Sequence, residues 1–342
     1  MVVLTYKIKH NRDFSNELQK ARLVAEYVLE NGLCTTPTVK HIGLKSTIAN
    51  AIIRKYGRNH KIKSIKSVKL TVPGQGVRRL GNELYISCLK LILPFNKDVI
   101  KINQIELNNV YAYVSCSVEE QPQFETKTHL GVDRNTTGNI ATIAIKETGK
   151  VWKLGKQALH IRQKYFAIRR KLQKQGRYKI VKRIKNKESR IVRDINHKIS
   201  RKIIDLAKEN ASEIRLEDLK GIRKAKTRKS FKGTLNSWAF YQLGEMLEYK
   251  AQLAGVKIFK INPAYTSKSC SRCGKIGERN GKIFKCHCGH VEHADVNAAF
   301  NIAFPSRALI RLQEERDSCK RRTDEPQGAT IWKLSTSEPQ VF

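Results

Sequence analysis

Acidic residues are scarce in this chain of 342 residues. Its 30 Asp and Glu residues stand against 67 Lys and Arg residues, which gives a formal net charge of +37 at pH 7. A compact fold with such a basic excess repels itself unless a polyanion supplies the opposite charge. Nucleic acid is the obvious polyanion, because phosphates that are neutralised by Lys and Arg release condensed counterions and so drive binding.

Long apolar runs are also missing. No run approaches the roughly 18 residues of a transmembrane helix, and neither an amphipathic anchor helix nor a lipidation motif is visible. Residues Met1–Lys9 alternate in the manner of a short strand rather than a signal peptide. We therefore expect no membrane partner and a location in the cytosol of prokaryotic type, beside the DNA of the cell.

Cysteines are few over most of the chain and crowded in one place. Of the eight, Cys34, Cys88, Cys116 and Cys319 are isolated, whereas the other four lie between Cys270 and Cys288. Disulfide frameworks are spread along a chain, so this clustering instead indicates a metal site in a reducing compartment.

The clustered cysteines have the spacing of a zinc site. Cys270 and Cys273 form a C-x₂-C knuckle, and after twelve residues Cys286 and Cys288 form a C-x-C knuckle. Two such pairs can place four thiolates around one Zn²⁺, and four protein ligands close the site, which makes it structural rather than catalytic. Because the second knuckle is one residue shorter than usual, nearby histidines are alternatives to Cys288: His287, His290 and His293.

The first 125 residues predict a β-rich module with a helical insert. Residues 1–10 alternate like a strand, apolar residues recur at helical spacing over 13–31 and 46–56, and residues 66–118 contain strands separated by glycine turns. We expect Asp13 or Ser15 to cap the first helix. The pattern indicates a barrel-like module over 1–125 with the helical insert at about 11–60.

From residue 126 the pattern predicts an α/β domain. A very basic helical stretch at 156–209 carries Ile191, Ile195, Ile199 and Ile203 on one face. The order βββ–α–β–α–β is typical of an RNase H-like core, and the polar tail at 305–342 is expected to be disordered. The expected strands are 128–133, 138–146, 149–154, 213–217 and 256–261, and a further helix is expected at 234–254.

Three acidic residues stand where this fold would bring carboxylates together. Asp133 and Glu217 each end a predicted strand, and Asp295 follows the cysteines at the start of a helix. Hard carboxylate ligands hold Mg²⁺, and two such ions about 4 Å apart suit phosphodiester hydrolysis. Each acid has another interpretation: Asp295 is an equally good helix cap, and Glu213 or Asp218 could take the place of Glu217.

These residues resemble the transposon-encoded OrfB/TnpB family, the compact relatives of type V CRISPR effectors. The resemblance is strong over about 125–304 and looser before it. It implies a RuvC-type nuclease core (126–262 and 290–304) with an inserted zinc ribbon (263–289), and a wedge module with a recognition insert before the core. The segments that carry it are Gly131–Asn139, Arg215–Leu219, Tyr265–Gly274 and His293–Ala299.

The resemblance implies an RNA-guided DNA endonuclease that cuts double-stranded target DNA next to a short adjacent motif. The guide RNA would come from the transposon end. Asp133, Glu217 and Asp295 match the family's catalytic, Mg²⁺-binding positions, and Cys270, Cys273, Cys286 and Cys288 match its ligands for one zinc ion. Two alternatives are a nuclease-inactive regulator that binds RNA or DNA, which the intact acids oppose, and a conventional RNase H-like transposase.

Two basic segments are candidates for nucleic-acid contact. Lys156–Lys202 contains 18 Lys and Arg residues and two acids, and Lys220–Lys232 contains seven and none. A channel for a guide–target heteroduplex would use such charges; the alternative is a solvated basic face. The candidate residues are Arg169, Arg170, Lys182, Arg183, Arg223, Lys224, Arg228 and Lys229.

Overall fold

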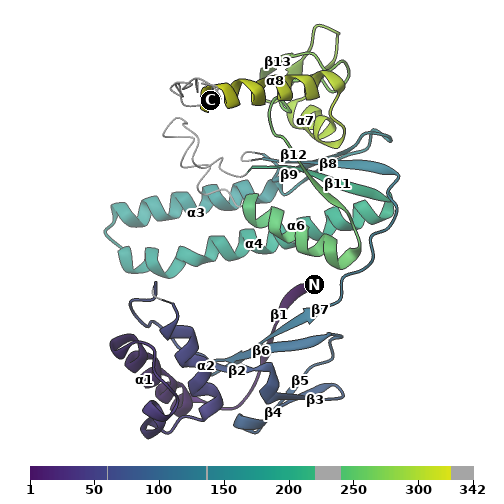
Figure 1. Cartoon of the computed structure of the whole chain (residues 1–342). Coiled ribbons are helices and arrows are strands. Elements are labelled where there is room, and N and C mark those ends of the chain that lie inside the picture. The colour runs from purple at the N-terminus through teal and green to yellow at the C-terminus, as the bar shows by residue number, and fades with distance from the viewer. Residues whose placement is uncertain (60, 136–137, 220–239, 325–342) are drawn as a thin grey trace, which may run out of the picture. The chain divides into compact units, whose positions relative to one another are not determined.

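The computed structural model describes residues 1–59, 61–135, 138–219 and 240–324. The chain divides into two compact units, Met1–Pro122 and Gln123–Phe342 (Figure 1). Each unit has a hydrophobic core of its own. Within the described ranges, every helix is too short or too polar to cross a lipid bilayer.

The first unit consists of two antiparallel sheets and two main helices, α1 (Ser15–Asn31) and α2 (Ser46–Gly57). One sheet has the strand order β1-β7-β6-β2 and the other has the order β3-β4-β5. The strands are β1 (Val2–Lys9), β2 (Leu70–Pro73), β3 (Val77–Leu80), β4 (Glu83–Ile86), β5 (Leu91–Pro94), β6 (Lys101–Leu107) and β7 (Tyr111–Val118).

Helix α2 shows why these segments fold as they do. Its buried residues Ile48, Ile52 and Tyr56 follow one another at intervals of four, so they line one face. The start of α1 differs from the expectation. Its N-cap is Phe14, without a side-chain cap, whereas the Asp13 carboxylate accepts a hydrogen bond from the Ser15 amide at 3.0 Å just before the helix.

A five-stranded mixed sheet is the centre of the second unit. Its order is β10-β9-β8-β11-β12; β9 is antiparallel to both β8 and β10, whereas β11 is parallel to both β8 and β12. All five strands lie within a few residues of their predicted positions. They are β8 (Thr128–Arg134), β9 (Ala141–Ile145), β10 (Val151–Leu154), β11 (Ser212–Glu217) and β12 (Ile258–Ile261).

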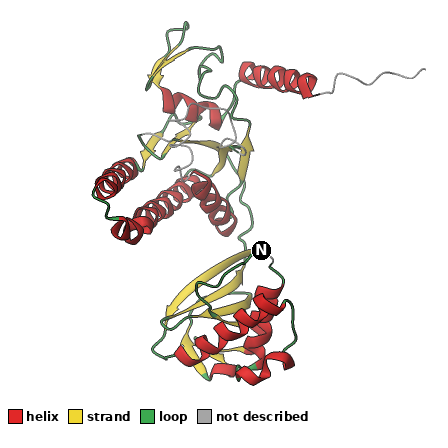
Figure 2. Cartoon of the chain, turned by 90° about the vertical axis from the view of Figure 1, so that its left-hand side faces the viewer, coloured by secondary structure: helices red, strands yellow, loops and turns green. Residues whose placement is uncertain are grey.

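One face of this sheet is covered by α4 and α6, and α3 packs against α4 (Figures 1 and 2). The predicted helical stretch 156–209 is two helices, α3 (Lys156–Lys174) and α4 (Tyr178–Glu209), because the chain reverses at Gly176, whose φ of +67° favours glycine. Helix α6 (Phe240–Ala254) lies where a helix was expected; residues 234–239 of that expectation lie outside the described residues.

The other face of the sheet carries α7 (Ala294–Ala303), which packs on β8, β9 and β11. Side chains alternate along a strand, so Leu130 and Val132 join the core under α4 and α6 while Gly131 and Asp133 point to the α7 side. A Cβ atom at Gly131 would lie 2.1 Å from the carbonyl oxygen of Ala299. Helix α7 therefore sits directly against the backbone of β8.

The four clustered cysteines lie just outside the strands of a small antiparallel sheet of order β13-β14-β15. Its strands are β13 (Glu278–Asn280), β14 (Ile283–Lys285) and β15 (Val291–His293). Strand β15 lies beyond the predicted end of the ribbon at residue 289, because it pairs with β14. The ribbon sheet therefore runs directly into α7.

The expectation of a disordered tail over 305–342 is wrong for its first part, which forms α8 (Arg307–Asp324). Leu309 is fully buried, and the Gln313 side chain donates to the carbonyl oxygens of Asn262 and Ala264 at 3.0 and 2.8 Å. These contacts with residues far back in the chain stabilise a helix that its own polar sequence does not predict.

Candidate active site and metal centre

The structure brings the three predicted carboxylates to one edge of the sheet. Val132 of β8 is paired with Leu216 of β11, so the next residues, Asp133 and Glu217, lie side by side near the carboxyl ends of two neighbouring parallel strands. Asp295 is the second residue of α7, the helix that lies over β8. Strand pairing thus places two of the acids, and helix packing places the third.

Burial and like charge act together on Asp133. Its side chain is almost fully inaccessible. Burial, followed by the negative charges of Glu217 and Asp295, raises the pKa of Asp133 to about 8. Burial also raises the pKa of Glu217, against the effects of the Thr266 hydrogen bond and the Arg134 charge. Carboxyl groups held this way are typical of sites that bind cations or perform acid–base chemistry.

Two of the acids are oriented by specific donors. The Asn135 amide donates to Asp133 Oδ2 at 3.0 Å, and the Thr266 hydroxyl donates to Glu217 Oε1 at 2.6 Å. The buried guanidinium of Arg134 donates to the carbonyl oxygen of Glu217, which ties the ends of β8 and β11 together. The carboxylates are therefore held in defined orientations.

Asp295 is held by cations of the ribbon hairpin. Although its side chain is only 1% exposed, Arg279 Nη2 lies 3.1 Å from Oδ1 and Lys282 Nζ lies 2.6 Å from Oδ2. Asp295 is not the N-cap of α7: His293 occupies that position, and its ring accepts from the Asp295 amide at 3.3 Å. Its carboxylate is in the first turn, where the helix dipole favours negative charge.

The cysteine region forms a second, separate cluster. The four sulfur atoms of Cys270, Cys273, Cys286 and Cys288 lie within 4.8 Å of one another. Cys270 and Cys288 are separated by 3.7 Å between their sulfurs, and Cys273 and Cys286 by 3.5 Å. A tetrahedral Zn²⁺ site with bonds of about 2.3 Å requires sulfur–sulfur separations of about 3.8 Å. The four thiols thus fit one zinc ion.

The short second knuckle does not displace Cys288. Gly289 has a φ of +81°, and its amide donates to the Cys286 carbonyl at 3.0 Å, so the turn closes within the shortened knuckle. Of the alternative ligands, His290 is buried, and its Nε2 lies 3.3 Å from the Ser271 hydroxyl. Among the residues that the structure describes, the grouped ligand atoms are the four sulfurs.

Residues 240–302, which run from α6 through the cysteines to α7, match the family described as the Cas12f1-like TNB domain. The chain is also 32% identical over 215 residues to a TnpB-like protein of Aquifex aeolicus, a match that covers 55% of this chain and 70% of that protein. The chain belongs to the TnpB-like family.

Relatives of this TnpB-like chain include a Cas12f1 protein. The chain is 34% identical over 302 residues to the CRISPR-associated endodeoxyribonuclease Cas12f1 of Sulfoacidibacillus thermotolerans, and the match covers 82% of this chain and 64% of that relative. A TnpB-like protein of Methanocaldococcus jannaschii is 38% identical over 127 residues, covering 36% of this chain and 46% of that protein. The chain thus matches less than two thirds of either relative.

The fold agrees with that of a solved Cas12f1 chain. The cryo-EM structure of a Cas12f1–sgRNA–target DNA complex matches with a TM-score of 0.59 over 85% of this chain and 82% of that chain. The sequence identity is 16%, so this likeness concerns the fold.

The predicted nucleic-acid contacts of the TnpB-like chain have different surroundings. Arg170, Lys182 and Arg183 are exposed on α3 and α4. Arg169 instead forms an ion pair with Glu188, which joins α3 to α4, so its charge already has an acidic partner within the hairpin. Four other predicted contacts lie outside the described residues: Arg223, Lys224, Arg228 and Lys229.

The sequence did not single out the residues that orient the acids. Arg134 and Asn135 directly follow Asp133, and Thr266 lies in a segment that carries the family resemblance, so their positions offered a signal. For Arg279 and Lys282 there was no signal beyond a general basic excess.

Proposed function

We propose that this TnpB-like chain is an RNA-guided DNA endonuclease of a transposable element, which cuts double-stranded target DNA next to a short adjacent motif by metal-dependent phosphodiester hydrolysis. The placement of Asp133 beside Glu217 and Asp295 carries this proposal, because burial and the charges of those two acids make an ionised Asp133 unfavourable unless a cation is bound. The names of the Cas12f1 relative, an endodeoxyribonuclease, and of the structural neighbour with sgRNA and target DNA support it.

The second unit is proposed to be a RuvC-type, RNase H-like core, at 126–262 and 290–304, with the ribbon inserted. The mixed sheet supports this assignment, since its first three strands are antiparallel and its last two run parallel to β8, with helices on both faces. We assign the first unit as the wedge module with a helical recognition insert. The two antiparallel sheets and the helices α1 and α2 support that assignment.

The carboxylate site suits Mg²⁺ by the chemistry of its donors. Asp133, Glu217 and Asp295 offer hard oxygen ligands, and the pKa of Asp133 is raised by burial and then by the two neighbouring negative charges, so a bound cation would stabilise its ionised form. When bound, Mg²⁺ supplies water activation and stabilisation of the leaving oxygen. Within the chain, Asn135 and Thr266 hold the Asp133 and Glu217 carboxylates in orientation for it.

The zinc site is proposed to be structural. Four sulfur ligands leave no open position for substrate. The chemistry is therefore assigned to the carboxylates, and the zinc ion to the fold of the ribbon.

The proposed partners are a guide RNA from the transposon end and target DNA, in the cytosol. Exposed basic residues on α3 and α4, including Arg170, Lys182 and Arg183, are proposed to contact phosphates. Phosphate contacts hold a heteroduplex without regard to its sequence.

Sequencing the RNA that copurifies with the chain tests this function most directly, because the guide also defines the target. We expect cleavage of a matching plasmid to require that RNA. Asp133→Ala, Glu217→Ala and Asp295→Ala should each abolish cleavage while nucleic-acid binding is retained. Cleavage without RNA would support the transposase alternative, and RNA-dependent binding without any cleavage would support the regulator.

A further inference from the structure

Two buried asparagines join the first cysteine knuckle to helix α7. The Oδ1 atom of Asn297 accepts from the Ser271 amide at 2.8 Å, and its Nδ2 donates to the Ser269 carbonyl at 2.7 Å. Asn301, one turn later on the same face, donates to the Ser269 carbonyl at 2.7 Å and to the Thr266 carbonyl at 2.8 Å. The backbone on both sides of Cys270 is thus bonded to α7.

The same contacts lead to two of the carboxylates. Asn297 lies two residues after Asp295 in the first half of α7. Thr266, whose carbonyl accepts from Asn301, donates its hydroxyl to Glu217 at 2.6 Å. These hydrogen bonds therefore connect a zinc-binding knuckle with Thr266, which bonds to Glu217, and with the helix α7, whose first turn carries Asp295.

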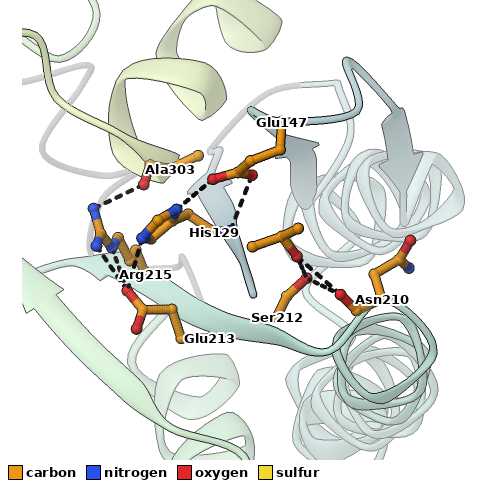
Figure 3. A network of polar contacts seen from close by, with 8 residues as sticks. His129, Glu147, Asn210, Ser212, Glu213, Arg215 and Ala303 are labelled. Carbon is orange, nitrogen blue, oxygen red and sulfur yellow. Dashed lines mark hydrogen bonds and ion pairs between the residues drawn. The ribbon is translucent and has the colours of Figure 1, made fainter. Parts of the chain in front are cut away.

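The far end of α7 is fixed independently of the ribbon. Arg215 Nη1 donates to the Ala303 carbonyl at 3.0 Å, and its Nε donates to Glu213 at 2.7 Å. Figure 3 shows this network continuing through His129, which lies between Glu213 and Glu147. Because this end is anchored to the sheet and Asn301 lies close to it, Asn297 is the asparagine that acts on the end of the helix that carries Asp295.

We propose that Asn297 and Asn301 are positioning residues, which transmit the geometry of the zinc ribbon to the catalytic metal site. This inference rests on the proposed function of Asp133, Glu217 and Asp295. A carboxamide that bonds two backbone groups of the knuckle at once fixes the rotation of α7 about its axis. That rotation determines where the Asp295 carboxylate stands relative to the other two acids, so the ribbon controls how well the acids bind a divalent cation.

The test measures metal binding by the zinc-loaded full chain without RNA or DNA. We expect Asn297→Ala to weaken Mn²⁺ binding, followed by electron paramagnetic resonance, by about 10-fold or more, the range found for groups that orient metal ligands. About one zinc ion per chain should remain. In cleavage assays, the Mg²⁺ concentration for half-maximal rate should rise by a similar factor.

Asn196→Ala is the matched control. Asn196 is a buried asparagine of the same unit, on α4, whose amide donates to Gln242 at 3.1 Å. We expect it to lower the melting temperature without changing Mn²⁺ affinity. If Asn297→Ala behaves like this control, its role is structural only and the inference is wrong.

Two further variants keep the test decisive. If Asn297→Ala does not fold, Asn301→Ser removes the two bonds to Ser269 and Thr266 with a smaller change, and unchanged Mn²⁺ affinity there overturns the inference. Asp133→Asn should lose most of the Mn²⁺ binding, which would show that the measured ion occupies the carboxylate site. A wild-type chain that binds Mn²⁺ there but never cuts DNA would contradict the proposed function and leave the inference standing.

Discussion

At the scale of single residues, the site is organised around unfavourable electrostatics. Asp133 is buried beside two other carboxyl groups, which raises its pKa to about 8 from an ordinary value of 3.8. Such an arrangement lowers the stability of the metal-free fold, and it is retained where binding a cation compensates for it. The two predictions that follow test how the charges at this site affect its stability and its binding of metal ions.

The first prediction concerns pH. Between pH 4 and 8 the folded chain keeps a proton on Asp133 that the unfolded chain has released, so this contribution to stability is complete below pH 4 and lost as the pH rises to about 8. Mg²⁺ replaces that proton, so its binding should tighten over the same range. We expect Mg²⁺ to raise the melting temperature more at pH 8 than at pH 6.

Asp133→Asn provides the control for the pH prediction, because its amide cannot titrate. This variant should show a small Mg²⁺ effect that is equal at both pH values, and a melting temperature without Mg²⁺ that falls less between pH 6 and 8 than that of the wild type. Equal Mg²⁺ effects at the two pH values in the wild type would show that Asp133 is already ionised at pH 6.

The second prediction concerns Lys282, whose ammonium lies 2.6 Å from Asp295 Oδ2. A cation at this oxygen competes with a divalent ion for the same carboxylate. Lys282→Met should therefore lower the melting temperature without metal, because the buried Asp295 charge loses a partner, and should tighten Mn²⁺ binding several-fold. Lys282→Arg keeps the charge and should change both quantities less. Weaker Mn²⁺ binding in Lys282→Met would show that Lys282 supports the metal site instead.

At the scale of elements, the cysteine ribbon contains the proposed zinc site and contacts the proposed carboxylate site. Its first knuckle is bonded to α7, and its hairpin supplies the two cations beside Asp295. The knuckle and the hairpin surround a small core, in which Phe284 is the largest buried side chain. We expect so small a core to depend on the proposed zinc ion for its stability.

The third prediction identifies the fourth zinc ligand. Cys288→Ser should lose zinc and lower the stability of the chain, since the sulfurs of Cys270 and Cys288 lie 3.7 Å apart in the cluster. His290→Ala should keep about one zinc ion per chain and lose its side-chain contacts with Ser271 and the Phe284 ring. Metal analysis of the two purified variants decides between them, and the reverse result would make His290 the ligand.

Elements were predictable from sequence where local pattern determines them. The alternation of Leu130 and Val132 marks a strand that carries Asp133 near its carboxyl end, and the spacing of the cysteines predicts the two knuckles directly. The bonds that orient the acids were not predictable in this way. Thr266 lies 49 residues from Glu217, and its contact depends on how the chain returns after β12. Helix α8 was missed because distant contacts stabilise it.

At the scale of the whole molecule, charge is the dominant property. A net charge of +37 opposes compaction, and few of the basic residues are neutralised by the ion pairs of the described residues. Bound nucleic acid would supply the missing negative charge, and its binding would then depend steeply on salt concentration. The α3–α4 hairpin offers a direct way to measure this, because its basic residues differ in their surroundings.

The last prediction uses that difference. Lys182→Ala combined with Arg183→Ala removes two exposed charges of α4. The negative slope of log affinity against log salt should become shallower by about 0.9 for each phosphate that the variant no longer neutralises. The decrease in affinity should be equal for all guide sequences, because phosphates carry no base identity.

Arg169→Ala is the contrasting variant. Its guanidinium pairs with Glu188, so it should reduce stability while leaving the slope nearly unchanged. Filter binding at several salt concentrations measures both variants, and an unchanged slope in the double variant would make this part of the hairpin a solvated face that does not contact nucleic acid.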